Sequence, residues 1–259
     1  MVKQVEVIEW KNVVDDLFQL LRIKTIPIGM KMYESKEDME AIAKIRRPTK
    51  VHTTDQIVAQ GARLGWTVGI TAEDLVMPQC GAVIGLHKQD EEWLDGEPMA
   101  GVWFETKEDA RAHQEAMHVV PYGQYEAMAV SPLVSGRIDN PDICLIYGTP
   151  GQIMILINGL QWSGYKNLNW GVVGESSCAD SWGRALKTKE PSLSIPCYAE
   201  RRYGGVLDEE MLMAIPPSHL VKAIEGMKKL SKNGLRYPIA QYGIQQDAQE
   251  GLGFSYNKK

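Results

Sequence analysis

The spacing of apolar residues predicts how the first part of the chain folds. Charged residues separate a set of apolar positions near the N-terminus: Val5, Ile8, Val13, Leu17, Leu20 and Leu21. Because this spacing places the apolar side chains on one face of a helix, it predicts an N-terminal helix. A strand is predicted over 26–35, and a short polar helix or loop over 36–47. Three good N-cap residues at 53–55 open an apolar-periodic segment, which predicts a second helix that ends near Gly65.

A strand that leads directly into a helix is predicted at the start of the second half. Residues 143–146 are an apolar run between Pro-Asp and Gly148, a pattern typical of a buried strand. Thr149 then occupies an N-cap position, and Pro150 the first position of a helix. The two elements are therefore joined by a tight loop.

The two halves of the chain share a series of short similarities. YEAMAVSPL at 125–133 resembles EEMLMAIPP at 209–217, since each has an acidic residue, Met-Ala, a β-branched residue and Pro. A duplication would explain the order of such matches. It predicts repeat halves at 26–140 and 141–230, whose Met-Ala strands occupy corresponding positions in the sheet. Chance similarity among common residues is the alternative.

Together these elements predict an α/β fold with a mixed sheet and packed helices, in one compact domain that spans residues 1–259. The length and an apolar fraction of 44% are sufficient for a sizeable core. If the halves are duplicated, Cys80 and Cys178 occupy equivalent positions.

Charge and composition exclude several classes of protein. The 28 Lys and Arg residues and 33 Asp and Glu residues give a net charge of −5 without a concentrated basic stretch, so nucleic-acid binding is not expected. No apolar run of about 18 residues is present, and the N-terminus lacks the pattern of a secretory signal. We therefore expect a cytoplasmic protein without a membrane span, whose four cysteines are free thiols or metal ligands.

Four segments carry a family resemblance: PDICLIYGTPGQ (141–152), GESSCADSW (174–182), LSIPCYAERR (193–202) and DEEMLMAIPPSHL (208–220). In this order they resemble the domain-of-unknown-function family 169 of bacteria and archaea. The resemblance is specific over about 141–230 and weaker back to about residue 26. It implies a cytoplasmic protein, frequent in anaerobes, without a settled activity.

The resemblance also sorts the cysteines. The family usually has an aliphatic residue at the position of Cys144, which leaves Cys80, Cys178 and Cys197 as the thiols that match its pattern. Cys144 lies inside the predicted apolar strand, where a free cysteine is typically a buried core residue.

Three cysteines are therefore candidate metal ligands. Cys80 and Cys178 each precede a predicted helix, where backbone N–H groups and the helix dipole would stabilise a thiolate. Cys197 is followed by Arg201 and Arg202, and a nearby arginine also favours the thiolate. We predict that Cys178 is a functional thiolate; packing of its side chain beneath the preceding Gly-rich turn is the alternative.

Three thiolates would suit a 4Fe–4S cluster that leaves one iron open to a substrate. Zinc held by three thiolates and a histidine is the alternative, and a site without metal is a third. The C-x₂-C spacing of zinc ribbons and ferredoxins is absent. The cluster is therefore predicted from the combination of helix-start cysteines and the family resemblance.

We expect a metalloenzyme of anaerobic metabolism that acts on a small organic substrate. Candidate proton-transfer residues are Glu175, Asp180 and Glu200, and Arg201 is a candidate for binding a substrate anion. A structural ion pair of Arg201 with the acidic residues at 208–210 explains the same pattern. A non-catalytic cofactor- or ligand-binding accessory protein is the alternative function.

The composition also predicts self-association. An apolar fraction of 44% with seven tryptophans exceeds what the predicted core requires. A homodimer is expected, because two-fold dimers are the commonest oligomers.

Overall fold

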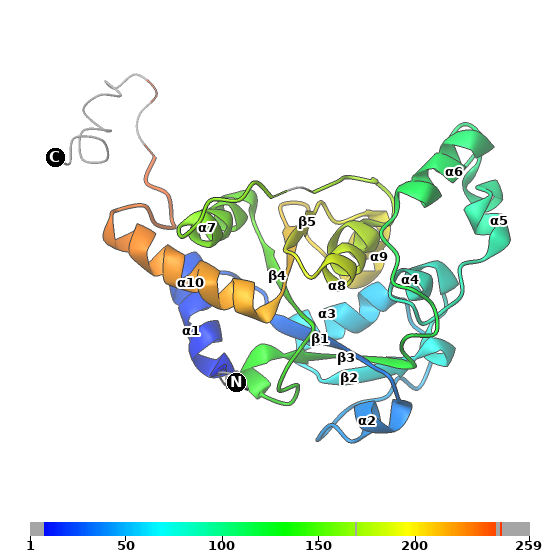
Figure 1. Cartoon of the computed structure of the whole chain (residues 1–259), viewed down its shortest axis with the longest axis horizontal. Helices are drawn as coiled ribbons and strands as arrows, with labels where there is room; N and C mark the ends of the chain where they lie inside the picture. The colour runs from blue at the N-terminus through cyan, green and yellow to red at the C-terminus, as the bar shows by residue number, and fades with distance from the viewer. Residues whose placement is uncertain (1–7, 169, 242–243, 245–259) are drawn as a thin grey trace.

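A six-stranded sheet forms the centre of the computed structural model, which describes residues 8–168, 170–241 and 244 (Figure 1). The strands are β1 (Ile28–Tyr33), β2 (Val68–Thr71), β3 (Ala127–Pro132), β4 (Ile143–Gly148), β5 (Ser192–Ser194) and β6 (Met211–Ile215). Their order across the sheet is β2-β3-β1-β4-β6-β5. All the neighbouring strands pair antiparallel. The prediction of an α/β fold is confirmed, but the sheet is antiparallel and not mixed.

Both faces of the sheet are buried. Successive side chains of a strand point to opposite faces. In β4, Ile143 and Leu145 belong to the core on one face, whereas Cys144 and Ile146 belong to the core on the other. This double burial explains why the β4 sequence is continuously apolar and does not alternate.

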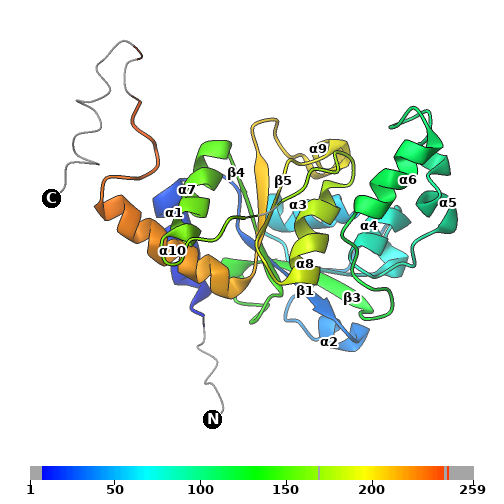
Figure 2. The same ribbon diagram turned by 45° about the horizontal axis from the view of Figure 1, so that its top comes forward.

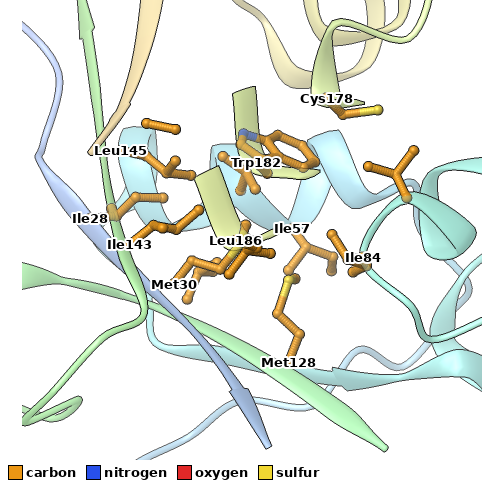
Figure 3. Packing of buried hydrophobic residues seen from close by; sticks show 14 of the residues in the cluster. Ile28, Met30, Ile57, Ile84, Met128, Ile143, Leu145, Cys178, Trp182 and Leu186 are labelled. Carbon is orange, nitrogen blue, oxygen red and sulfur yellow. The ribbon is translucent and has the colours of Figure 1, made fainter. Parts of the chain in front are cut away.

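The first face packs around Trp182, whose side chain is fully buried. Its covering elements are α3 (Thr54–Leu64), α4 (Pro78–Val83), the π-helical turn η4 (Ala179–Gly183), α8 (Arg184–Thr188) and α9 (Tyr198–Gly204). Figure 3 shows the indole ring among side chains from β1, β4, α3 and α8, with Cys178 at the upper edge of the view. Trp182 therefore links η4 to the sheet.

The second face is covered by another group of helices. They are α1 (Trp10–Leu21), α2 (Lys36–Glu40), α7 (Pro150–Gln161) and α10 (Pro217–Lys232). Helices α7 and α10 pack closely where Gly159 faces Gly226: a Cβ atom built on Gly226 would lie 1.9 Å from the Gly159 carbonyl oxygen. This crossing therefore requires glycine.

A group of short elements lies beyond α4, at the end of the molecule opposite α10 (Figures 1 and 2). It contains α5 (Glu91–Leu94), η2 (Glu97–Met99) and α6 (Lys107–Ala116). The remaining short turns are η1 (Ala72–Asp74) and η3 (Leu133–Ser135). No helix in the described part of the chain is both long enough and apolar enough to cross a membrane.

The predicted helix boundaries are confirmed where caps mark them. The Thr53 hydroxyl accepts a hydrogen bond from the Gln56 backbone N–H, and the Gln56 side chain accepts one from the Thr53 N–H. This capping box begins α3, and Gly65 ends it with a φ of 71°. Thr149 begins α7 in the same way. The first apolar position of the predicted N-terminal helix, Val5, lies outside the described residues, and α1 begins at Trp10.

The strand order is repeated in the two halves, but a duplication is not shown. From edge to centre the halves read β2-β3-β1 and β5-β6-β4, so Met128 and Met213 lie on the middle strands. The longer helix between β1 and β2, α3, packs on the opposite face of the sheet from α7, however, because α3 belongs to one core and α7 to the other.

The predicted equivalence of Cys80 and Cys178 is wrong. Cys80 follows β2, the second strand of its half, whereas Cys178 precedes β5, the second strand of the other half. Cys197, which follows β5, is the cysteine whose place in the strand order corresponds to that of Cys80.

Candidate functional site

Five acidic or thiol side chains come together on the first face of the sheet. We call them the acid–thiol cluster: Asp55, Cys80, Cys178, Cys197 and Glu200. Four of them are buried, with at most 7% of the residue surface exposed, and Cys80 is half-buried. They come from four separate segments, at the starts of α3, η4 and α9 and within α4. The packing of these elements therefore creates the site.

Asp55 lies in the first turn of α3 with an unused acceptor. Thr53 already caps this helix, and the Oδ2 atom of Asp55 is buried without a hydrogen-bond partner among the described residues. Burial raises the pKa of Asp55 from 3.8 to about 6, and the negative charge of Glu175 adds to this effect. The close approach of α9 to α3 at Gly204, near the Asp55 carbonyl, closes the site.

Glu200 is held by two hydroxyl groups. The Ser177 hydroxyl donates to its Oε2, and the Tyr147 hydroxyl donates to its Oε1 at 3.4 Å. The Cys197 backbone N–H donates to the Ser177 oxygen at 2.8 Å, which fixes the start of α9 against η4. Burial and the neighbouring Asp55 charge raise the pKa of Glu200 from 4.5 to about 7.

The thiols are adjacent but are not stabilised as thiolates. Cys178 lies beside Cys80, and the interaction of the two thiols together with burial raises the Cys178 pKa well above 9.0. Burial and the charge of Glu200 raise the pKa of Cys197 to about 11. The predicted stabilisation of thiolates by helix starts and arginine is wrong for these two residues. Desolvation and nearby carboxyl groups outweigh the helix dipole.

No basic side chain balances the acid–thiol cluster within the described residues. Among the groups that shift the pKa values of its buried members, none is Lys, Arg or His. The nearby Arg63 guanidinium lies 5.5 Å from the centre of the Tyr147 ring, but it forms a two-point ion pair with Glu210 at 3.1 and 2.5 Å. The cluster is therefore electrically neutral only when its acids and thiols carry protons.

A narrow crevice of about 200 Å³ reaches Asp55 and Glu200 from the side of Arg63 and Val206. It does not admit a sphere the size of a water molecule. An organic substrate would therefore need a local opening of α3 or α9 to reach these carboxyl groups.

The other predicted catalytic residues lie at the margin or elsewhere. Glu175 is half-buried, acts electrostatically on Asp55, and its backbone carbonyl bonds the His113 Nε2 at 2.9 Å. Asp180 accepts a hydrogen bond from the Val173 N–H at 2.9 Å, and burial raises its pKa to about 6. Asp180 therefore fastens the segment before η4.

Arg201 has a structural role. Its guanidinium donates to the Pro196 carbonyl at 3.1 Å and to the Leu207 carbonyl at 2.5 Å, and it lies 3.8 Å from the Asp208 carboxylate. These bonds join the two ends of α9. Arg201 thus makes the structural ion pair with Asp208 that was the alternative to binding a substrate anion.

Three residues of the site were not identified from the sequence. Asp55 was considered only as a helix cap, and Tyr147 and Ser177 only as parts of the segments that carry the family resemblance. Asp55 could have been identified because it is not needed as a helix cap. Thr53 alone caps the helix, so a buried carboxylate beside it needs another explanation.

The donor atoms suit a soft metal, although no finished coordination shell is present. Thiols and carboxylates are ligands for zinc and iron. Within residues 8–168, 170–241 and 244, no three Cys, His, Asp or Glu side chains are arranged to hold one metal ion. Metal binding would therefore require the side chains of the acid–thiol cluster to rearrange.

The fold and site define an α/β protein whose antiparallel sheet, buried on both faces, carries a cluster of acids and thiols on one of them. The chain belongs to the DUF169 family, described as Uncharacterised ArCR, COG2043, which matches residues 16–226. This range includes every member of the acid–thiol cluster and confirms the resemblance found in the sequence.

One curated relative is an uncharacterised protein of Methanocaldococcus jannaschii. It is 24% identical over 122 residues, which are 46% of this chain and 52% of the relative. The chain thus spans about half the length of the curated relative it matches. No solved structure matches the chain.

Proposed function

We propose that this chain is a cytoplasmic metalloenzyme of anaerobic metabolism that acts on a small organic substrate at the acid–thiol cluster. In this proposal Cys80, Cys178 and Cys197 ligate the metal centre, and Asp55 and Glu200 lie beside it. The observation that supports it is the convergence of three thiols and two carboxyl groups in a buried site that no basic side chain of the described residues balances. Four free cysteines also suit a reducing compartment.

The electrostatic argument is direct. Ionised carboxylates and thiolates are costly to bury unless a cation accompanies them. A bound metal supplies that cation, and it replaces the protons of the thiols that become its ligands. The Oδ2 of Asp55, which has no hydrogen-bond partner among the described residues, is an oxygen available to the same cation.

The contact between Cys80 and Cys178 bears on the kind of metal centre. Two thiolates on one tetrahedral ion with bonds of about 2.3 Å lie roughly 3.8 Å apart, which is also the range of a thiol–thiol contact. The ligands of a 4Fe–4S cluster bind different irons and lie farther apart. A single zinc or iron ion therefore needs the smaller rearrangement, whereas a 4Fe–4S cluster needs α4 to move away from η4.

Residues of the chain would hold and transfer a proton next to the substrate. Glu200 is oriented by the Ser177 and Tyr147 hydroxyl groups, so it can hold or pass a proton at a fixed position. The bound metal would supply a Lewis acid next to that carboxyl group. Burial on the first face of the sheet excludes bulk water from the Glu200 carboxyl group and from the metal.

Metal and sulfide analysis of protein purified without oxygen tests the proposal. We expect stoichiometric metal in the wild type, with acid-labile sulfide only if the centre is an iron–sulfur cluster. Cys178→Ser should remove at least nine-tenths of the metal. Cys144→Ser is the matched control, because Cys144 is equally buried but belongs to the core on the opposite face. Metal-free wild-type protein, or equal loss in both variants, would contradict the proposal.

A non-catalytic accessory protein that binds a cofactor or ligand is the second candidate. It is favoured by the narrowness of the crevice at Asp55 and Glu200, which leaves no room for a substrate in the described conformation. A metal-loaded protein that binds small organic acids without converting them would support this candidate over the enzyme.

A further inference from the structure

A second, separate site is suggested by a hollow beside α4. It has a volume of about 490 Å³ and lies between α4, α6 and the segment that leads from α6 to β3. A neighbouring hollow of only about 20 Å³ shares Ala82, Leu94 and Met117 with it, so the two are continuous. Sites for small organic ligands commonly have volumes of about 300–1,000 Å³.

Somewhat more than half of the wall surface is apolar. Ala82 of α4, Leu94 of α5 and the segment at Met117 and Val119 contribute hydrocarbon side chains to the larger hollow. Leu94 is 37% exposed, so it is not already covered by another element. Figure 2 shows α5 and α6 standing beside α4 and away from the sheet, which explains how a hollow forms here.

Two basic side chains reach this apolar wall from different parts of the chain. Lys88 follows α4, and Lys187 comes from α8. Neither ammonium group forms an ion pair within the part of the chain that the structure describes. This positive charge also acts on His118. Burial lowers the pKa of its imidazole, and the charges of Arg184 and Lys187 lower it further.

Negative charge in the two hollows is limited. Glu115 is the carboxylate that lines the larger one. Asp90 lines the smaller one, where its Oδ1 accepts from the Glu92 N–H at 2.9 Å and the Trp93 N–H at 3.4 Å. The larger hollow therefore carries two ammonium groups against one carboxylate, so an anionic group that enters it meets net positive charge.

We propose that this hollow binds a small amphipathic organic anion, with an apolar ring or chain against Ala82, Leu94 and Met117 and a carboxylate or sulfonate between Lys88 and Lys187. The site is distinct from the acid–thiol cluster and does not depend on metal binding there. Two lysines without ion-pair partners among the described residues attract an anion, and the apolar part of the wall selects an anion that carries hydrocarbon surface.

Two fluorescent compounds with similar rings test this site. 1-Anilinonaphthalene-8-sulfonate is an anion, and N-phenyl-1-naphthylamine is its neutral counterpart. We expect the full-length protein to bind the sulfonate with one-to-one stoichiometry and at least tenfold more tightly than the amine. Lys88→Gln combined with Lys187→Gln should weaken sulfonate binding about tenfold and leave amine binding unchanged.

Two further variants locate the binding. Leu94→Asp should weaken the binding of both compounds, and because Leu94 is partly exposed the fold should tolerate it. Lys222→Gln on α10, at the opposite end of the molecule, is the control and should change neither. Equal affinity for the sulfonate and the amine, or no effect of the double lysine variant, would overturn the proposal. Equal affinity would point to an apolar surface for a protein segment instead.

Discussion

The carboxyl group of Asp55 is stabilised in its protonated form by burial, and this has consequences for stability. Its pKa is about 6 in the folded protein against 3.8 for an exposed aspartate. Folded protein therefore holds the proton more tightly than unfolded protein does. The stability that results is fully present below pH 4 and is lost as the pH rises through about 6.

Replacing Asp55 with Asn should remove the loss of stability that occurs as the pH rises through about 6. In metal-free protein at pH 8, Asp55→Asn is expected to raise the free energy of unfolding by up to about 3 kcal/mol, since each pKa unit corresponds to about 1.4 kcal/mol. At pH 4 the variant and the wild type should be equally stable. Urea denaturation at the two pH values measures the difference.

Asp95→Asn is the control for that experiment, with the opposite sign. Asp95 is exposed, and its pKa is lowered by hydrogen bonds from Lys107 and Arg111. Its replacement should therefore lower stability at pH 8 and have no effect where the carboxylate is protonated. A gain in stability at pH 8 from both substitutions would contradict the role given to burial at Asp55.

Among the contacts between elements, the crossing of α7 and α10 is the one least tolerant of a larger side chain. Gly226→Ala would place its Cβ 1.9 Å from the Gly159 carbonyl oxygen, so the two helices must separate. We expect a loss of about 3 kcal/mol in the free energy of unfolding, as for other overpacked sites. Gly151→Ala is the matched control, because the nearest atom to its Cβ is 3.7 Å away. Thermal denaturation should show no loss for this control.

The elements also differ in how far their own sequence specifies them. The N-cap residues at 53–55 and Thr149 predicted the starts of α3 and α7, because each cap is local: in the structure it is a capping box between residues only three apart. The π-helical turn η4 has no side-chain cap and encloses Trp182, so it depends on packing against the sheet. Sequence reasoning predicted a helix there but not its wider turn.

At the scale of the whole molecule, the prediction of a homodimer stays open to experiment. Several large apolar side chains are exposed in the single chain, including those of Trp103, Tyr165 and Trp170. Sedimentation equilibrium at micromolar concentration should give twice the chain mass of 29.0 kDa. A single species of 29.0 kDa would show that the exposed side chains do not form a dimer interface.

The sheet shows which parts of the fold were accessible from the sequence. The residue pattern predicted β1 within 26–35 and β4 after Pro-Asp, with Gly148 at its end, and the structure has Ile28–Tyr33 and Ile143–Gly148. The direction in which strands pair was not accessible, because the antiparallel contact of β1 with β4 joins residues more than 100 positions apart, such as Ile28 and Leu145. The expectation of a mixed sheet was wrong for this reason.

The site was accessible only in part. Cys80, Cys178, Cys197 and Glu200 were selected as candidates, and the structure brings all four together. Arg201 was selected as a ligand for anions, but its guanidinium binds backbone carbonyls at both ends of α9. Whether a charged side chain faces a site or fastens a loop depends on the atoms packed around it, which a linear sequence does not display.

The sequence by itself determined the features that arise between near neighbours: helix caps, the apolar runs of buried strands, and the division between Cys144 in a core strand and the other three thiols. Only the tertiary structure decided that Asp55 meets Cys178 and Glu200, and that these groups hold protons more tightly than in water. The physical reason is that pKa values and contacts depend on burial and on charges from distant segments. Both exist only after α3, η4 and α9 have packed together.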